Sequence, residues 1–502
     1  MRRWIRVVTA TMLACAGTIA AGGQPANDGS ERPTPDSRQA VQTQQDRIAA
    51  IENGLRPPLA ARGEPGPLWT LRERMAHHKV PAVSIAVSID GKLAWAKAYG
   101  ILEAGSAEPV DADTLFQAAS LSKPVAALAA LTLVDRGQID LDAPVNAYLT
   151  SWQIPENAFT RAEKVTLRHL LSHRAGTTIH GFEGYGVDQI HPTSTQILTG
   201  EAPANTSPVV IDKTPGESRR YSGGGFQVAQ LLIEDVAATP FAYYVQANVF
   251  EPAGLSRSNY EFVQRHSNVA SGHVGSKSKP IPAPGYYAYP ERAAAGLWTT
   301  PSEMVRLGAR VAAARSVGGG IISQDLARQL VPDRADEPGL GFGLNDPGDG
   351  IVFVHNGHNP GYSARWFTYG DGRASVAIMT NSDTGGKLIR EVASAIGYVY
   401  GWKQDAFEER EIVDLPEAWQ EQLVGGYAFD AASGQPVASI SLEDGRLWIE
   451  GELAERSRFY PTSREHFFIP GGLNFTIETD GDGNATGLNV EGEFVLSKLP
   501  GG

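Results

Sequence analysis

The alternation of hydrophobic and polar positions predicts β-strands at both ends of the region before about residue 405, with helices between them. Near its start, Val80–Val87 is a strand-like run, Asp90-Gly91 is a hairpin turn, and Leu93–Tyr99 returns as a second strand. After Gly296, strand signals come back at residues 341–344, 351–355, 364–369 and 374–381, before a helical pattern at 388–402. This order predicts a mixed α/β domain that carries an inserted helical subdomain.

Helical patterns dominate between these two groups of strands. The apolar run Val125–Val134 is rich in alanine and leucine and is followed by Gly137, a residue type that favours helix C-termini. Residues 138–290 contain little strand pattern. Helical spacing is also found at residues 39–55, 68–75, 167–172 and 223–234.

The pattern changes after about residue 405, where short strands alternate with turns of glycine, aspartate and asparagine. Strands are expected at residues 437–442, 447–449, 458–462, 466–469, 473–478 and 487–490. Short strands between tight turns are typical of a small sandwich or barrel. We therefore predict a main domain over residues 67–405 and a separate small all-β domain over residues 406–502.

Composition restricts the classes of protein to which the chain can belong. With 502 residues, of which 42% are hydrophobic and 20% charged, it has the make-up of a soluble globular protein of two or three domains. The net charge of −13 and the lack of a basic run after the N-terminus disfavour nucleic acid as a partner. Acidic charge supports solubility and identifies no partner.

Residues 1–22 have the pattern of a signal peptide, because a basic start precedes the apolar run Val7–Ala21. This predicts export to the periplasm or outside the cell, followed by a flexible segment over residues 23–66 that holds one helix. Cys15 is the only cysteine, so the chain cannot form an internal disulfide. Met12-Leu-Ala-Cys15 loosely resembles a bacterial lipoprotein box, and lipidation at Cys15 is the one membrane attachment that the sequence leaves open.

Candidate chemistry is concentrated at Ser120-Leu-Ser-Lys123, just before the apolar run. On a helix, positions three apart share a face, so the amine of Lys123 can reach the hydroxyl of Ser120. A serine hydroxyl is a weak nucleophile until a neighbouring group takes its proton, and a desolvated lysine can be that base. The same spacing recurs at Ser276–Lys279, but glycine and proline surround it and no apolar run follows, which indicates a solvated loop.

Two further segments hold groups suited to acid–base or oxyanion chemistry. Tyr221 precedes three glycines and a helical pattern, where its phenol could relay a proton; the alternative is a packed tyrosine at a flexible turn. His355-Asn356-Gly357-His358 ends one predicted strand and opens a turn, where backbone N–H groups could face a ligand. The alternative is a turn with solvent-exposed histidines.

Two patterns imitate metal sites and have simpler structural explanations. His169 and His173 have the spacing of zinc ligands on a helix, but the glutamate of the metalloprotease motif is missing and no third ligand is evident. Asp480-Gly-Asp482-Gly-Asn484 resembles a calcium loop, but Ala485 stands where that loop needs glycine. We expect a structural histidine pair, a polar hairpin tip, and no metal or organic cofactor.

Together and in this order, the motifs resemble the serine β-lactamase and penicillin-binding-protein superfamily, in its class C β-lactamase-related branch. The resemblance extends over about Leu68–Trp402 and rests on residues 83–100, 116–124, 137–145, 167–176, 215–222, 295–301 and 355–357. It implies a β-lactamase/transpeptidase-like fold, in which an antiparallel sheet is flanked by helices and an inserted helical subdomain. The C-terminal β-domain resembles the barrel-like appendage of some peptidases and esterases of this branch.

The resemblance also implies a role for each candidate residue. Ser120 would be the acyl-accepting nucleophile, and Lys123 and Tyr221 would share the general acid–base work. The third motif, Lys-Thr-Gly in β-lactamases, is His355-Asn356-Gly357 here, as in some D-peptidases and esterases. The backbone N–H groups of Ser120 and His358 would form the oxyanion hole.

One departure from the family pattern bears on the activity. The tyrosine motif is normally Tyr-x-Asn, with an asparagine that helps to hold the lysine and the substrate amide. Gly223 takes that position here, which argues against β-lactamase activity.

We therefore expect an exported serine hydrolase that forms an acyl-enzyme at Ser120 with a small-molecule or peptide substrate, an ester or an amide, with a D-residue peptide as one candidate. Two alternatives remain open: a weak β-lactamase or DD-carboxypeptidase, and a non-catalytic protein that binds cell-wall peptides or acts as a scaffold. The sequence identifies neither the substrate nor the oligomeric state.

Overall fold

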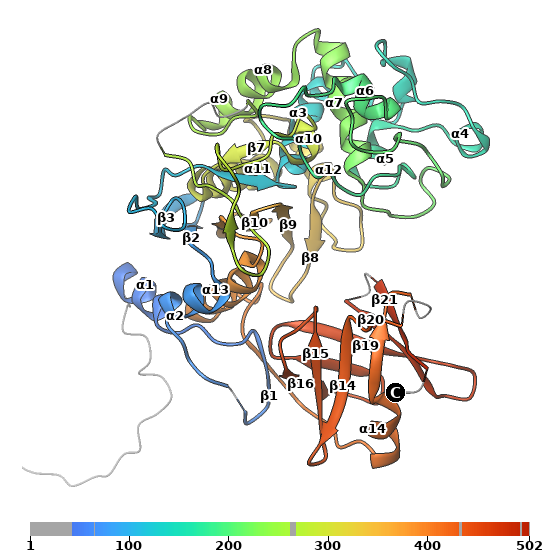
Figure 1. Ribbon diagram of the computed structural model, residues 1–502. Helices are drawn as coiled ribbons and strands as arrows, with labels where there is room; N and C mark the ends of the chain where they lie inside the picture. Colours follow the sequence, from blue (N-terminus) through green and yellow to red (C-terminus); the bar gives the residue numbers. More distant parts are fainter. Residues whose placement is uncertain (1–42, 65, 262–267, 431–433, 492–493, 501–502) are drawn as a thin grey trace, which may run out of the picture. The chain divides into compact units, whose positions relative to one another are not determined.

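The computed structural model describes residues 43–500, apart from residues 65, 262–267, 431–433 and 492–493 (Figure 1). The predicted signal peptide, Cys15 and the start of the predicted helix at 39–55 lie outside the described residues. Contacts group the chain from Gln44 onward into one unit. The domain boundaries at residues 66 and 405 stay predictions.

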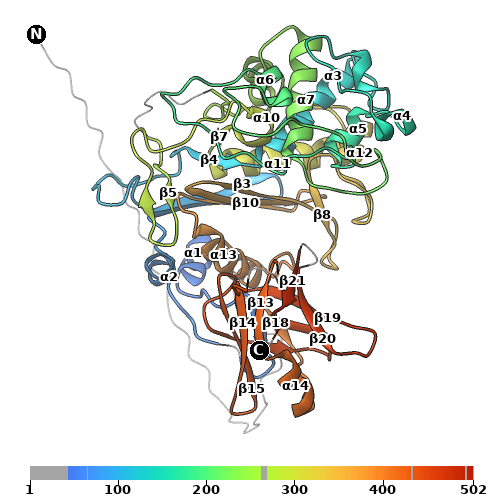
Figure 2. The same cartoon turned by 45° about the vertical axis from the view of Figure 1, so that its right-hand side comes forward.

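A six-stranded antiparallel sheet is the centre of the first region (Figures 1 and 2). Its strands are β2 Ala82–Ile89, β3 Lys92–Gly100, β8 Gly343–Asn345, β9 Val352–Asn359, β10 Tyr362–Tyr369 and β11 Ala374–Thr380. Their order is β3-β2-β11-β10-β9-β8, so β2 of the N-terminal hairpin pairs directly with β11, with Val83 opposite Thr380. The predicted mixed α/β fold with an antiparallel sheet is confirmed.

The two faces of this sheet belong to two different cores. Val83, Ile85 and Val87 of β2 pack with α13 Gly385–Tyr400, α1 Gln44–Glu52 and α2 Leu71–His78. Ala82 and Ala86 face the opposite way, into the core that contains α11 Pro301–Val317 and the helical part of the chain. Successive residues of a strand point to opposite faces, and the apolar character of both sets makes β2 buried on both sides.

Helix α11 is the main element that the hydrophobic pattern missed. Its start carries the usual signals: Thr300 is the N-cap and accepts a hydrogen bond from the backbone N–H of Glu303, and Pro301 occupies the first turn. Gly318 follows its last residue. Capping signals were likewise decisive for α2, which begins at Leu71 rather than Leu68, because Thr70 and Glu73 form a capping box.

The regular elements of the inserted part are mainly helices, joined by long loops (Figure 1). Its helices are α3 Ser122–Asp135, α4 Ala158–Ala162, α5 Leu167–Leu171, α6 Ser194–Thr199, α7 Gly223–Ala237, α8 Phe241–Val245, α9 Glu251–Ala253, α10 Arg292–Ala295 and α12 Gln324–Leu330. A two-stranded sheet of β4 Phe116–Ala119 and β7 Leu297–Thr299 connects it to the main sheet. Helix α3 is buried along almost its whole length, as expected for a helix that is apolar all round.

The C-terminal part forms a nine-stranded antiparallel sheet with its own apolar core. Its strands are β13 Gly425–Ala428, β14 Ala438–Glu443, β15 Arg446–Gly451, β16 Ser457–Arg458, β17 Tyr460–Pro461, β18 His466–Ile469, β19 Leu473–Thr479, β20 Ala485–Val490 and β21 Phe494–Lys498. Strands β16 and β17 end the strand order on opposite sides yet are consecutive in the chain, so the sheet curls into a nearly closed barrel. The predicted all-β architecture is confirmed; β13, β21 and the helix α14 Glu417–Leu423 were not predicted.

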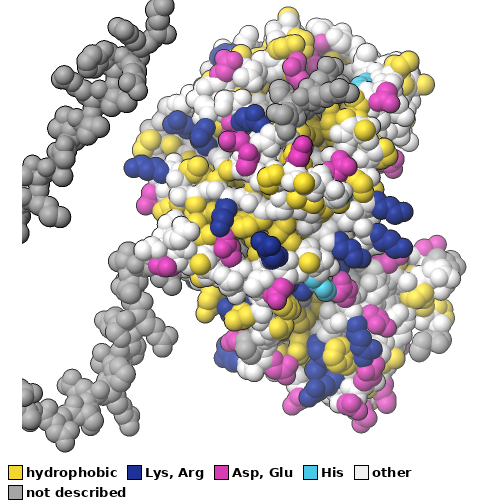
Figure 3. Space-filling model, turned by 60° about the vertical axis from the view of Figure 1, so that its left-hand side comes forward, with side chains coloured by type: hydrophobic (Ala, Val, Ile, Leu, Met, Phe, Trp, Pro, Cys, Tyr) yellow, Lys and Arg dark blue, Asp and Glu magenta, His cyan; other side chains and the backbone are white. Residues whose placement is uncertain are grey.

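A short parallel pair, β1 Leu59–Ala61 with β12 Glu408–Arg410, precedes this barrel. None of the helices among the described residues has both the length and the hydropathy that crossing a bilayer requires. Acidic and basic side chains are interspersed over the face of the molecule drawn in Figure 3.

Candidate active site

Ser120 lies in the turn that joins strand β4 to helix α3. The residue before it, Ala119, has a φ of 51°, in the left-handed region that residues other than glycine rarely adopt. The side chain of Ser122 holds this turn, since its Oγ donates to the carbonyl of Ala119 at 2.6 Å and accepts from the backbone N–H of Leu297 at 2.9 Å. Backbone strain of this kind persists only where the surroundings fix the conformation, and it concentrates at functional sites.

The amine of Lys123 lies beside the hydroxyl of Ser120, as the sequence predicts. Nζ is 3.0 Å from Ser120 Oγ and donates to the backbone carbonyl of Ala294 in α10 at 2.8 Å. The lysine side chain is only 1% exposed. Two fixed contacts on a buried amine therefore aim it at the serine, while Ser120 itself is half-buried and accessible to a substrate.

Tyr221 completes this group from the residue before the N-cap of α7. Lys123 Nζ lies 4.8 Å from the centroid of the Tyr221 ring. Two imidazole rings also lie close to it, with centroids 4.4 Å away for His173 and 4.9 Å away for His180. Tyr221, which is far from Ser120 and Lys123 in the sequence, thus comes together with them at one site.

His173 and His180 were not predicted as parts of this site. The sequence gives His173 only a spacing of four residues from His169, and the loop that follows α5, where functional side chains are common, is the one signal that could have indicated it. His173 Nδ1 accepts from the backbone N–H of Ser222 at 3.2 Å. Within the described residues, no group of three or more potential ligands could hold a metal ion.

Both His355 and His173 are neutral imidazoles at physiological pH. Burial, together with the nearby charge of Lys123, lowers the pKa of His355 to about 3. Burial and the same lysine hold the pKa of His173 well below its ordinary value. His355 Nδ1 is 2.6 Å from the carbonyl of Asn356, so in the neutral ring this nitrogen carries the proton and Nε2 is the acceptor.

The prediction that His355–His358 opens a turn is wrong. Strand β9 continues through all four residues to Asn359, and the turn to β10 comes at Pro360-Gly361. Gly357 serves a different purpose, because a Cβ there would overlap the carbonyl oxygen of Ala118 in β4. The glycine allows β9 to lie directly against the strand that leads to Ser120. His355 is buried and His358 exposed, as alternation along a strand requires.

Comparison with known proteins agrees with this arrangement. A family model described as "Beta-lactamase" matches residues 70–398, more than half of the chain. The chain belongs to the β-lactamase family. The whole match lies before the barrel, and it includes Ser120, Lys123, Tyr221 and the His355–His358 strand.

Relatives of this β-lactamase-family protein include penicillin-binding proteins and an esterase. Penicillin-binding protein 4* of Bacillus subtilis is 21% identical, over 86% of this chain and 94% of its own length. The esterase EstB of Burkholderia gladioli is 28% identical, over 57% of this chain and 76% of its own length. The octameric penicillin-binding protein homologue from Pyrococcus abyssi has a similar structure, with a TM-score of 0.56, 20% identity, and coverage of 85% of this chain and 98% of its own. The protein is thus a β-lactamase-related serine hydrolase.

The second Ser-x-x-Lys segment is not a helix in this β-lactamase-family structure. It forms the turn between two short strands, β5 His273–Val274 and β6 Lys279–Pro280, as expected of a loop. The segment that imitates a calcium loop is the hairpin tip between β19 and β20. There the carboxylate of Asp480 accepts from the backbone N–H groups of Asp482 and Asn484 at 3.0 and 2.8 Å.

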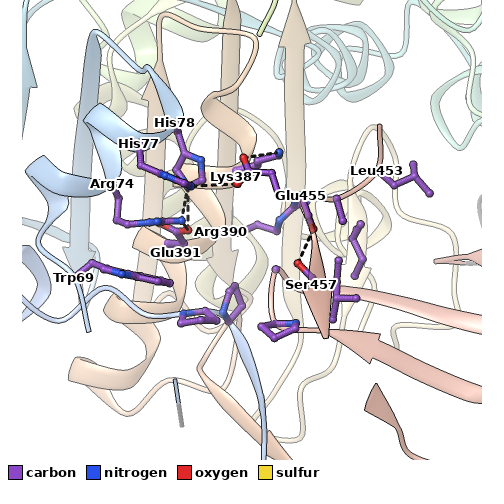
Figure 4. Close-up of a pocket in the computed structure, with 17 residues that line it drawn as sticks. Trp69, Arg74, His77, His78, Lys387, Arg390, Glu391, Leu453, Glu455 and Ser457 are labelled. Atoms are coloured by element: carbon purple, nitrogen blue, oxygen red, sulfur yellow. Dashed lines mark hydrogen bonds and ion pairs between the residues drawn. The ribbon is translucent and has the colours of Figure 1, made fainter. Parts of the chain in front are cut away.

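A separate cavity of about 180 Å³ lies where α2 and α13 approach the segment 453–457 (Figure 4). Arg74 Nη2 and His78 Nε2 lie 2.6 and 3.0 Å from Glu391 Oε1. Burial would raise the pKa of the Glu391 carboxyl, but its hydrogen bonds with His78 and Arg74 outweigh burial and hold the pKa below its ordinary value. None of the three candidate catalytic residues lines this cavity, which is therefore distinct from the candidate active site.

One buried carboxyl next to α10 should make stability depend on pH. Glu291 is fully buried, and burial raises the pKa of its carboxyl to about 7, against the smaller lowering effect of a contact with Tyr185. Between the ordinary pKa of 4.5 and about 7 the unfolded chain loses this proton while the folded chain keeps it. The free energy of unfolding should therefore fall by roughly 3 kcal/mol as the pH rises through this window.

Glu291→Gln removes this titrating group. The free energy of unfolding of the variant should therefore rise relative to that of the wild type as the pH increases from 5 to 8. Urea unfolding at several pH values measures the difference, and Glu337→Gln, at an exposed position, is the matched control whose difference should stay constant. Parallel plots of the free energy of unfolding against pH for the wild type and Glu291→Gln would contradict the prediction.

Proposed function

We propose that this protein is an exported serine hydrolase that forms an acyl-enzyme at Ser120 with an ester or amide. The observation that carries the proposal is the 3.0 Å contact between Ser120 Oγ and the buried amine of Lys123. A nucleophile with an adjacent proton acceptor whose orientation is fixed by a third group is the usual arrangement of covalent catalysis. Here the third group is the carbonyl of Ala294.

In this mechanism Ser120 Oγ attacks the substrate carbonyl while its proton passes to Lys123 or Tyr221. The same pair then returns a proton to the leaving group, and water releases the acyl group by the reverse sequence. The backbone N–H groups of Ser120 and His358 would stabilise the negative charge that develops on the carbonyl oxygen. Support for this last role comes from Gly357, which allows β9 to contact β4 next to Ser120.

The neutral imidazole of His355 favours substrates without a carboxylate beside the scissile bond. A lysine at this position would offer a positive charge, whereas His355 offers only an uncharged hydrogen-bonding ring. An ester or a simple amide fits this better than a penicillin, whose carboxylate would lack a charged partner at residue 355. A small ester or amide, including one with a D-residue, is therefore the proposed substrate class. The signal-peptide pattern of residues 1–22 supports export to the periplasm or beyond.

A fluorophosphonate probe tests the proposed nucleophile. The wild-type protein should gain a single adduct by intact mass, and Ser120→Ala should gain none. Ser276→Ala is the matched control, because it removes the serine of the second Ser-x-x-Lys segment, and it should label like the wild type. A folded wild-type protein without an adduct would overturn the proposal and favour a non-catalytic binding protein.

A further inference from the structure

The segment Thr177–Phe182 lies along the first turn of helix α7. Ser222, the N-cap of this helix, directly follows Tyr221. The backbone N–H groups of Gly223 and Gly224 donate to the carbonyls of His180 and Ile179 at 2.9 and 3.0 Å. These N–H groups are at a helix start, where no partner within the helix exists. The segment therefore caps α7 with its own backbone.

Three consecutive glycines make this contact possible. A Cβ at Gly223 would lie 2.9 Å from Phe182 Cε2, at Gly224 2.7 Å from the Thr178 carbonyl oxygen, and at Gly225 2.9 Å from Thr177 Oγ1. Any side chain at these positions would therefore push the segment away from the helix. This explains the glycine run, which forms the first turn of α7, in agreement with the helix predicted over residues 223–234.

The segment is also held in a strained conformation. Ile179 has a φ of 61°, and a β-branched residue in the left-handed region is a genuine outlier. Such strain is maintained only where the surroundings fix the chain, and here the surroundings include the side chain of Ser222, which donates to the carbonyl of Thr178 at 2.6 Å. The position of the residues that follow Ile179 is therefore well determined.

As a result, an aromatic ring lies against the start of α7 at residue 223. Phe182 is half-buried, and its ring edge occupies the place into which a side chain at residue 223 would project. Residue 223 is two positions from Tyr221, whose ring lies 4.8 Å from Lys123 Nζ. His180, from the same segment, packs against the Tyr221 ring.

We propose that Phe182 forms an apolar wall of the substrate site and selects substrates with an apolar group next to the scissile bond. This inference rests on the proposed acyl-enzyme at Ser120 and names the substrate class of that site. A half-buried phenylalanine offers apolar contact area to a substrate but no hydrogen bond. It therefore binds alkyl or aryl groups favourably and does not stabilise polar groups. Filling an apolar pocket by one or two methylene groups typically changes kcat/KM by about 10-fold or more.

Two series of esters test the proposal. The first varies the acyl group, from p-nitrophenyl acetate to butyrate to hexanoate, and the second varies the alcohol, from methyl to butyl to hexyl acetate. The kcat/KM of the wild type should rise with chain length in one of the two series. The series that shows the rise identifies whether the acyl group or the alcohol contacts Phe182. Phe182→Ala should reduce the ratio of kcat/KM for the longest substrate to kcat/KM for the shortest in that series by about 10-fold.

Phe159→Ala is the matched control, because Phe159 is an exposed phenylalanine in α4, and it should keep the wild-type ratio. Unchanged ratios in both series for Phe182→Ala would overturn the proposal. An equal loss on all esters would also overturn it, since a purely structural role would lower every rate together. A wild-type protein that hydrolyses no ester and matches Ser120→Ala would instead overturn the proposed function, and the role of Phe182 with it.

A double-mutant cycle tests the steric part of the argument. Gly223→Asn alone should lower kcat/KM on p-nitrophenyl butyrate by more than about 10-fold, because its side chain and the Phe182 ring compete for one space. Phe182→Ala combined with Gly223→Asn should recover part of that loss. A double variant no more active than Gly223→Asn would show that another group occupies the space and would overturn the assignment of Phe182 as the wall.

Discussion

Replacing Lys123 by methionine should reduce kcat/KM on p-nitrophenyl acetate by at least ~10³-fold. The amine is 3.0 Å from Ser120 Oγ and almost completely buried, so bulk water cannot take its place beside the hydroxyl in the proton transfer. Methionine has a similar length and no proton to exchange. The rate of fluorophosphonate labelling at Ser120 should fall in parallel, because the probe depends on the same activation of the hydroxyl.

Stability must be measured alongside, because Lys123 also satisfies a buried acceptor. Its bond to the carbonyl of Ala294 is lost in Lys123→Met, and an unpaired buried carbonyl costs about 1–3 kcal/mol. The melting temperature of Lys123→Met should therefore be several degrees below that of the wild type, while the protein stays folded at 25 °C. Lys279→Met, in the second Ser-x-x-Lys segment, should change neither quantity. A folded Lys123→Met protein with wild-type activity would show that another group accepts the proton.

The elements of the main sheet could be predicted because their signals are local. The hairpin of β2 and β3 follows from an apolar run, Asp90-Gly91 and a second run, and the structure has its turn at those two residues. Strand β18 lies at the predicted residues 466–469. By contrast, α11 was missed because its apolar positions are mixed with three arginines and two serines, and only its capping residues identify it.

The candidate site could be predicted only as far as its motifs reach. Ser120 and Lys123 are neighbours in the sequence, so their contact followed from helical spacing. The positions of His173, His180 and Phe182 around Tyr221 depend on the path of the segment after α5. That path is determined by tertiary contacts with the glycines of α7, and no local pattern in residues 173–182 encodes it.

Gly357 was predicted as a residue of the candidate site, but the structure shows a different reason for the glycine. The sequence predicts that His355–His358 opens a turn, in which glycine lets the backbone approach a ligand. In the structure the backbone of Gly357 has ordinary strand geometry, and the requirement for glycine comes from the close approach of β4. This requirement comes from Ala118 in β4, which is far from Gly357 in the chain. The pattern of residues 355–358 therefore cannot reveal it.

Gly357→Ala should therefore lower kcat by about 10²- to 10³-fold, even though alanine is compatible with a β-strand. Its Cβ would overlap the carbonyl oxygen of Ala118 and lie 3.1 Å from Leu121 Cδ1, so β9 must move away from β4. That movement would displace the backbone N–H of His358 relative to Ser120, and one misplaced oxyanion donor costs about this factor. The effect should appear in kcat more than in KM, because the donor acts on charge that develops during the reaction.

Gly343→Ala is the matched control for this prediction. Gly343 lies in the neighbouring strand β8, where a Cβ would meet nothing closer than the Val354 carbonyl oxygen at 3.6 Å, an ordinary contact. This variant should keep the wild-type kcat. Equal activity of Gly357→Ala and Gly343→Ala would mean that β9 can shift without cost to the reaction. The oxyanion donor on β9 would then be refuted, while Ser120 and Lys123, which lie on the other side of this contact, would keep their roles.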